Sequence, residues 1–228
     1  SPNTESIWRG LARAHSESAQ YAEAREAAEK AVELAPEVAD GWTMLGTVLA
    51  GALEPGKARE AFAKALQLKP LQPRVLLSMG HVEKTIGDSR ASEIAYDEAF
   101  RIDPSLGEAM WSKADLKTYR FRPEEIEAMN RQLGKDISNT SDVAAFHFAL
   151  GKAYEDDQAY ELSFSHYQSG NRIKAELEPF PMEEFKSRNK QIRSAFSSPP
   201  ESVKGVHKSP TPISVSYTHL RAHETRYH

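Results

Sequence analysis

Residues 37–70 read EVADGWTMLGTVLAGALEPGKAREAFAKALQLKP, and this stretch determines the fold that the sequence predicts. It ends in Pro70, and two further prolines, Pro36 and Pro104, stand 34 residues before and after that position. A period of this length, with aromatic, small and proline positions in a fixed order, is typical of tandem helix-turn-helix units. The sequence therefore predicts an all-α solenoid over about the first half of the chain.

Each position of the pattern has a physical role. Trp42 and Leu45 lie three residues apart, so they share one face of the first helix of the unit. Gly46 is small enough for the two helices to approach to about 8–10 Å, and Phe62 offers apolar surface on the second helix. Pro70 follows the second helix and prevents its continuation. The other two copies are Trp8, Leu11, Ala12, Ala24, Ala28, Ala31 and Pro36, and Leu76, Met79, Gly80, Ser92, Tyr96, Ala99 and Pro104.

These copies resemble the tetratricopeptide repeat (TPR) family. The resemblance implies three TPR repeats within residues 1–104, as helix pairs at 5–36, 37–70 and 71–104. An ordinary bundle of amphipathic helices is the alternative. A bundle would not keep small and proline positions in register through three copies, so we favour the TPR solenoid.

The period is lost after the third copy. Residues 105–140 are predicted to form a degenerate helix pair that extends over 107–135. Residues 107–119 have the apolar spacing of one helix. Pro123 and the two acidic residues after it are typical of a helix start, because acids are favourable at the positive end of the helix dipole.

Residues 141–174 are predicted to form a terminal TPR-like pair, with the Ser-Asp pair at 141–142 as the cap of its first helix. This segment contains FHFALGKAYEDD at 146–157, YELSF at 160–164 and Gly-Asn at 170–171. The block resembles the last helical pair of bacterial TPR-containing sulfotransferases. The alternative is a generic terminal TPR pair with no enzyme attached.

The sulfotransferase resemblance implies a function for a complete parent protein. Such a parent would transfer a sulfo group from 3′-phosphoadenosine 5′-phosphosulfate to a hydroxyl or tyrosine acceptor. Its first catalytic strand would begin near Ile213 and lead into a glycine-rich loop that holds the donor phosphate through backbone N–H groups. The sequence contains no loop of that form. We therefore expect no catalytic, cofactor-binding or metal-binding residue here, and no activity from this chain alone.

Two other functions remain open. A stand-alone TPR adaptor that mediates protein–protein assembly needs no catalytic domain. The DNA that follows the codon of Ile213 in the source genome distinguishes this adaptor from the sulfotransferase. A TPR glycosyltransferase of the O-GlcNAc type fits less well, because the repeats lose regularity by residue 107.

The segment after the last pair is predicted to be a linking helix at 175–196 followed by a linker at 197–213. Basic residues on the helix would suit a nucleic-acid surface. A solvated helix face explains them better, because no basic excess extends beyond this helix. The linker is rich in proline and serine, and would lead to the sulfotransferase domain that this chain lacks.

Residues 214–228 are predicted to be an artefact. The run VSYTHLRAHET at 215–225 matches a conceptual translation of a common transposon-based sequencing adapter, so we expect a disordered and dispensable tail. His219 and His223 have the spacing of two zinc ligands on one helix, with Glu224 beside them. The adapter origin explains the same three residues without a metal.

Composition excludes several classes of site and protein. The chain has 228 residues, of which 27% are charged, with a net charge of −4, which gives no general reason to expect a nucleic-acid partner. The absence of cysteine excludes disulfides and thiolate zinc sites. No run of about 18 apolar residues is present, and no secretory leader is visible, so we expect a cytoplasmic protein without a membrane span.

The expected partner is a protein or peptide on the concave face of the repeats, which the first helix of each repeat lines. The mixture of residues there is polar and weakly basic. It lacks the lysine and asparagine set of the chaperone-type carboxylate clamp, so support for a peptide with an acidic C-terminus is slight. The candidate contacts are Arg9, Arg13, Thr43, Thr47, Leu77, His81, Lys84 and Lys152.

Other polar residues have ordinary structural explanations. His147 and His166 fall on the two helices of the terminal pair, where packed or surface histidines are expected and proton transfer is the alternative. The acidic pairs at 124–125 and 156–157 are adjacent residues whose side chains point apart on a helix. Asn139 begins a glycosylation sequon, but a loop that ends in a helix cap explains it more simply.

Overall fold

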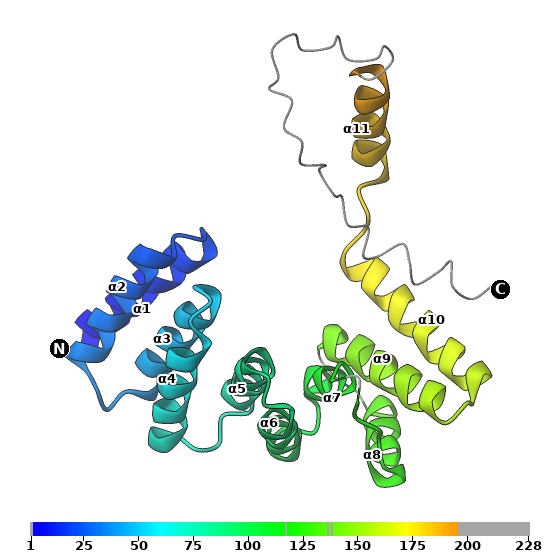
Figure 1. Cartoon of the computed structure of the whole chain (residues 1–228), viewed down its shortest axis with the longest axis horizontal. Coiled ribbons are helices and arrows are strands. Elements are labelled where there is room, and N and C mark those ends of the chain that lie inside the picture. Colours follow the sequence, from blue (N-terminus) through cyan, green and yellow to red (C-terminus); the bar gives the residue numbers. More distant parts are fainter. Residues whose placement is uncertain (1, 117, 136, 138, 196–228) are drawn as a thin grey trace, which may run out of the picture. The chain divides into compact units, whose positions relative to one another are not determined.

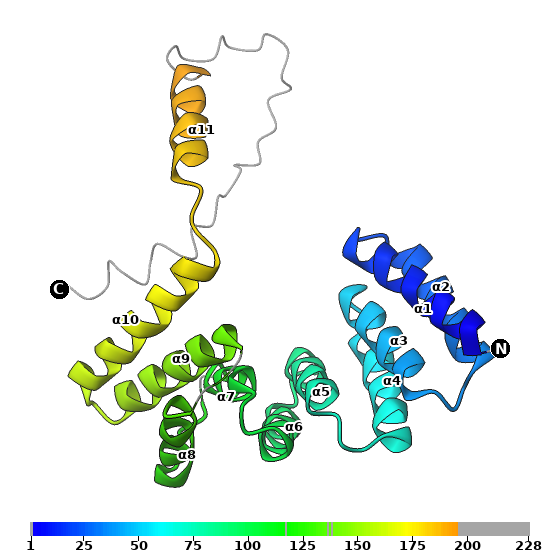
Figure 2. The ribbon, with the colours of Figure 1, turned by 180° about the vertical axis from the view of Figure 1, so that it is seen from behind.

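The computed structural model describes residues 2–116, 118–135, 137 and 139–195, and the regular secondary structure in these residues is entirely helical (Figures 1 and 2). The all-α prediction is therefore confirmed. The predicted linker at 197–213 and the predicted artefact at 214–228 lie outside the described residues. The helices are α1 (Pro2–Glu17), α2 (Tyr21–Leu34), α3 (Ala39–Gly51), α4 (Pro55–Leu68), α5 (Pro73–Ile86), α6 (Ser89–Ile102), α7 (Gly107–Ala114), α8 (Pro123–Leu133), α9 (Thr140–Asp156), α10 (Tyr160–Leu177) and α11 (Met182–Ala195).

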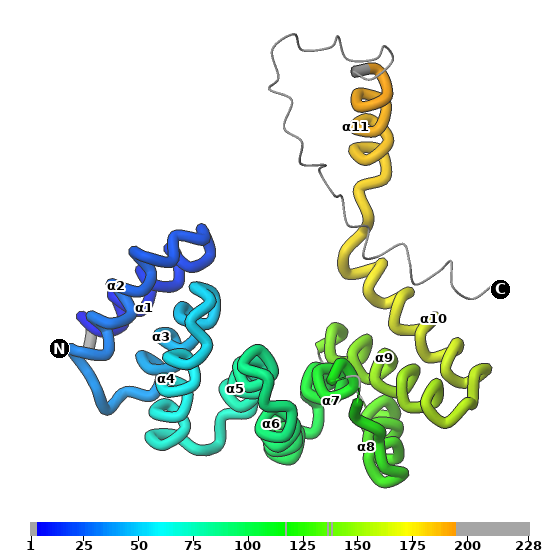
Figure 3. Tube along the Cα trace, in the orientation of Figure 1, coloured from blue at the N-terminus to red at the C-terminus, as the bar shows by residue number. Residues whose placement is uncertain are grey.

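The first six helices form three consecutive antiparallel pairs, which can be followed along the tube in Figure 3. Within a pair, α1 packs against α2, α3 against α4 and α5 against α6. Between pairs, α1 also contacts α3, and α3 contacts α5, so the first helices of the repeats form a layer of their own. This is the arrangement that the proline period predicts.

A small residue on the first helix receives an aromatic ring from the second helix. A Cβ atom added to Gly46 would lie 2.7 Å from the ring of Phe62. The equivalent distance from Gly80 to Tyr96 is 2.3 Å. Because real Cβ atoms do not approach a ring this closely, the glycine is what allows these two helices to pack. The predicted role of Gly46 is therefore confirmed.

The turns inside the pairs repeat with the same period. Ala19, Leu53 and Gly87 stand 34 residues apart, and each has a positive φ, of 56°, 60° and 97°. Gln158 in the turn between α9 and α10 also has a positive φ, of 61°. Only Gly87 adopts this left-handed conformation without a steric cost, so three of the four turns carry local strain.

Residues 105–140, which are predicted to form a degenerate helix pair, do not pack as a pair in the way that the first three repeats do. Helix α7 ends at Ala114 rather than at residue 119, because the chain turns there and brings Tyr119 over Lys113. Helix α8 packs against α9, and α7 packs against α9 as well. The two helices of 105–140 are thus present, but they share α9 as a neighbour instead of forming a close hairpin.

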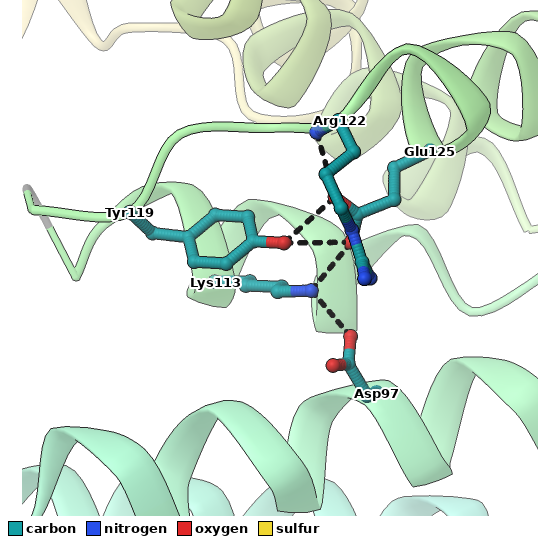
Figure 4. A network of polar contacts seen from close by, with 5 residues as sticks. All are labelled: Asp97, Lys113, Tyr119, Arg122 and Glu125. Atoms are coloured by element: carbon teal, nitrogen blue, oxygen red, sulfur yellow. Dashed lines mark hydrogen bonds and ion pairs between the residues drawn. The ribbon is translucent and has the colours of Figure 1, made fainter.

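A buried polar network joins α6, α7 and α8 (Figure 4). The Lys113 side chain is fully buried, and its ammonium group donates to Asp97 and to Glu125. It also lies 4.1 Å from the centroid of the Tyr119 ring. The Tyr119 hydroxyl and the Arg122 backbone N–H both donate to Glu125. The network therefore provides partners for the positive charge of Lys113, whose burial without partners would be very unfavourable.

The charges of this network stabilise one another. Burial alone would lower the pKa of Lys113, but hydrogen bonds to Asp97 and Glu125 raise it above its usual value. Burial alone would raise the pKa of Glu125, but hydrogen bonds from Arg122 and Lys113 outweigh this effect and lower it to about 2. Both groups are consequently charged at neutral pH.

The cap of α9 differs from the expectation. The side chain of Asn139 accepts a hydrogen bond from the backbone N–H of Ser141 at 3.1 Å, so Asn139 is the capping residue. Asp142 instead caps the neighbouring helix, because its Oδ1 accepts from the backbone N–H of Glu108 at the start of α7, at 3.1 Å. The sequence spacing could not reveal this cap, since it crosses from one helix to another.

Helix α11 belongs to a second unit, which begins at Pro181. A linking helix is predicted at 175–196, but residues 175–177 belong to the end of α10, and α11 covers only Met182–Ala195 of that segment. Met182, Phe185 and Ile192 are each about half exposed on it. Phe196, the last residue expected on the apolar face, lies outside the described residues.

Candidate protein-binding groove

The first helices α1, α3, α5, α7 and α9 carry two columns of equivalent residues, and we call the surface that they form the groove. Each of these helices has one small residue at the position that corresponds to Gly46 of α3 and Gly80 of α5. The first column consists of the residues three positions before this small residue. The second column consists of the residues that directly follow it. The first column is Arg9, Thr43, Leu77, Trp111 and Phe148, and the second is Arg13, Thr47, His81, Lys152 and Asp115, the last of which directly follows α7.

A pocket of about 310 Å³ opens in the groove between α3 and α5. Two of the predicted contacts, Thr47 and His81, line it. Most of its exposed surface is apolar, so its chemistry suits an apolar side chain. The complete lining is Thr47, Ala50, Leu53, Pro55, Phe62, Ser78, His81, Val82 and Thr85.

The hydroxyl groups of this pocket are oriented by their own helices. Thr47 Oγ1 donates to the carbonyl of Thr43 at 2.9 Å, and Ser78 Oγ donates to the carbonyl of Arg74 at 3.0 Å. Thr85 Oγ1 makes the same kind of bond two turns further along α5, to the carbonyl of His81 at 2.9 Å. Because each hydroxyl proton is already used, the oxygen lone pairs remain as acceptors for N–H groups of a ligand.

The cations of the groove are largely neutralised. Arg9 pairs with Glu5 at 2.9 Å. Lys84 pairs with Asp115, and Lys152 pairs with Asp156. These ion pairs leave the groove less basic than its sequence suggests. Of the four predicted cationic contacts, only Arg13, which is exposed, has no ion pair among the described residues.

Leu77 is buried, although its register predicts a contact in the groove. Its side chain is only 5% exposed and packs with Leu106 and Ala109 at the start of α7. A ligand in the groove cannot contact it without displacing α7. His81, by contrast, is exposed, and its Nε2 lies 3.0 Å from the hydroxyl of Ser112 on α7. This contact connects α5 to α7 along the groove.

Trp111 and Phe148 also face the groove, although neither is among the contacts predicted from the sequence. Their ring centroids lie 5.4 Å apart at an interplanar angle of 46°, and they line a second pocket, of about 260 Å³, between α7 and α9. The register could have identified both residues. Trp111 follows Leu77 by one period, and Phe148 precedes Gly151 by the same three residues that separate Leu77 from Gly80.

The two histidines of the terminal pair are in contact. His147 Nδ1 and His166 Nδ1 lie 3.0 Å apart, and the Tyr154 ring stacks on His166 with a centroid distance of 5.4 Å. Burial, followed by the charges of His166 and Arg172, lowers the pKa of His147, and burial lowers that of His166. Two ring nitrogens this close require at least one neutral imidazole, so the pair is a packed histidine contact at neutral pH.

His219 and His223, whose spacing suits zinc, lie outside the described residues. Within residues 2–195, apart from the positions that the structure leaves undescribed, no helix has both the length and the apolar character needed to cross a bilayer.

Comparison with known proteins supports the repeat fold. A family model described as "Tetratricopeptide repeat" matches residues 5–48. No curated protein matches the chain significantly. Two crystal structures of MamA align with TM-scores of 0.57 and 0.58, each at 15% identity. They cover 75% and 79% of this chain and 98% of MamA in both cases.

A MamA RS-1 ArsTM double mutant gives a TM-score of 0.56 at 15% identity, and the alignment covers 77% of this chain and 97% of that one. Identities this low establish the fold alone. The comparisons give no support to the sulfotransferase expectation. The chain therefore has a fold of TPR-like helix pairs that is similar to the fold of MamA, and residues 5–48 match the tetratricopeptide repeat model.

Proposed function

We propose that this chain is an adaptor that holds a segment of a partner protein in the groove, with an apolar side chain of that segment in the pocket between α3 and α5. The pocket is the observation that carries the proposal. It combines apolar walls with three hydroxyl oxygens, from Thr47, Ser78 and Thr85, that are free to accept. Backbone N–H groups of a bound peptide are the donors that fit these oxygens.

The charges of the groove support a partner that is selected by shape and apolar contact. Lys84 and Lys152 already have carboxylate partners, so an acidic peptide would have to displace Asp115 or Asp156 to reach them. Such an exchange would replace one carboxylate partner by another, so it would yield little net affinity. We therefore do not propose an acidic C-terminus as the ligand.

A random peptide library displayed on phage, selected against the full chain, tests this function. Thr47→Trp fills the pocket, and Ala63→Trp adds the same ring at an exposed position of α4. The selected peptides should carry a shared apolar residue. They should bind the Ala63→Trp variant as tightly as the native chain. They should bind the Thr47→Trp variant roughly tenfold more weakly. Equal binding to both variants would show that the pocket is not the site.

The second candidate function is the non-catalytic region of a sulfotransferase. The sequence of the terminal pair, with FHFALGKAYEDD at 146–157, is the observation that favours it. In this case the groove would present an acceptor to a catalytic domain encoded downstream. Sequencing the source genome beyond the codon of Ile213 tests the proposal. A phosphate-loop strand would support it, and a stop codon or further repeats would support the adaptor.

A further inference from the structure

The second pocket, between α7 and α9, has a chemistry unlike that of the first. Its walls include the rings of Trp111 and Phe148, and Trp111 is 36% exposed. A carboxylate, that of Glu108, stands one helical turn before Trp111 on the same face of α7. An aromatic wall with an acid at its edge is suited to a cation, because the ring faces and the carboxylate both carry negative potential.

The remaining charges of the pocket are already satisfied. Asp142 is 5% exposed, and its carboxylate accepts from the Glu108 backbone N–H at 3.1 Å and from Asn139 Nδ2 at 2.6 Å. Lys174 pairs with Glu178 at 2.7 Å. Glu108 is exposed, and its carboxylate makes no ion pair among the described residues. The uncompensated charge of the pocket is therefore negative.

We propose that this pocket binds an arginine side chain of the partner segment. The guanidinium plane would stack on Trp111 and Phe148 while its N–H groups donate to the carboxylate of Glu108. Arginine fits better than lysine because its planar, weakly hydrated head both stacks on rings and donates in a fork. The inference rests on the proposed function, in that the arginine would belong to the peptide held in the groove.

The location of the pocket agrees with this role. His81 of α5 contacts Ser112 of α7, and Trp111 of α7 contacts Phe148 of α9. The two pockets thus lie along one continuous layer of first helices. The partner segment would present an apolar residue at one position and an arginine further along.

A small probe tests the arginine site without the rest of the peptide. The full chain, labelled with ¹⁵N at its tryptophan indoles, is titrated with N-acetyl-arginine methylamide while the Trp111 indole resonance is followed. N-acetyl-citrulline methylamide is the matched control, since it keeps the shape and removes the charge. We expect a saturable shift with arginine, and binding of citrulline roughly tenfold weaker.

Variants complete the test. Glu108→Gln should weaken arginine binding by roughly fivefold or more, whereas Glu124→Gln, which also changes an exposed acid in the first turn of a helix, should leave it unchanged. Equal binding of arginine and citrulline, an absent shift, or full binding by Glu108→Gln would overturn the inference. Because Thr47→Trp leaves this pocket intact, the arginine titration and the phage selection can fail independently.

Discussion

The buried ammonium group of Lys113 on α7 donates to the carboxylate of Glu125 on α8, and this pair fixes the irregular part of the solenoid. Lys113 is fully buried, whereas the side chain of Glu125 is 12% exposed. The contact holds α8 in place although α8 does not form a close hairpin with α7. It therefore substitutes for the regular helix packing of the first three repeats.

Replacing Lys113 should destabilise the chain. Lys113→Met leaves Asp97 and Glu125 without their shared cation, and we expect a loss of about 3 kcal/mol in the free energy of unfolding, measured by urea denaturation. Lys57→Met removes a surface pair with Glu54 and should cost less than about 1 kcal/mol. Similar losses in the two variants would mean that burial of Lys113 has no energetic consequence.

Acid should remove the contribution that Glu125 makes to the free energy of unfolding. Its pKa falls from an ordinary value of 4.5 to about 2 on folding, so the stabilisation is fully present above pH 4.5 and is lost as the pH falls toward 2. The difference between the native chain and Glu125→Gln should be on the order of 3 kcal/mol at pH 7. It should shrink between pH 4.5 and pH 2 in parallel denaturation series. A difference that does not change with pH would contradict the low pKa.

The histidine pair predicts a second, milder acid effect. The pKa values of His147 and His166 are lowered in the folded chain, so the unfolded chain binds more protons below about pH 6.5. Stability should therefore be highest above that pH and fall as the pH drops through the lowered values. Thermal unfolding from pH 7.5 to pH 5 should show this fall, and His166→Gln should reduce it. An equally steep fall in the variant would assign the effect to other groups.

Two glycines should respond to alanine in opposite directions. Gly46→Ala places a methyl group 2.7 Å from the Phe62 ring, and we expect a loss of about 1–3 kcal/mol from overpacking. Gly10 has nothing within 4 Å of its would-be Cβ, so Gly10→Ala should gain about 0.5–1 kcal/mol through helix propensity. Denaturant midpoints measure both changes. A tolerated Gly46→Ala would place the two helices further apart than we describe.

Substitutions at two turn residues with positive φ should change the stability of the chain in opposite directions. Ala19 has a φ of 56° in the turn between α1 and α2, so Ala19→Gly should stabilise the chain by about 1 kcal/mol. Gly87 has a φ of 97° and no atom near its would-be Cβ, so Gly87→Ala should destabilise it by a similar amount through backbone strain alone. Differential scanning calorimetry should show a higher Tm for the first variant and a lower Tm for the second.

The sequence by itself determined the repeating part of the fold and the register of the groove. The proline period, Gly46 and Phe62 are local features, and each acts within one repeat of 34 residues. Helix periodicity decides which face is apolar, and a small residue decides where two helices cross. These rules also predict that Thr47 and His81 face the groove, and both residues line the pocket between α3 and α5.

Only the tertiary structure decided which charges are paired and which groove residues are accessible. Lys113 is buried because the turn after α7 brings Glu125 and Tyr119 around it, and nothing in the local pattern of α7 fixes that path. Leu77 is covered by the start of α7, although its register matches that of the exposed Trp111. Periodicity specifies the face of a helix, whereas burial and ion pairing depend on the neighbouring helix that covers that face.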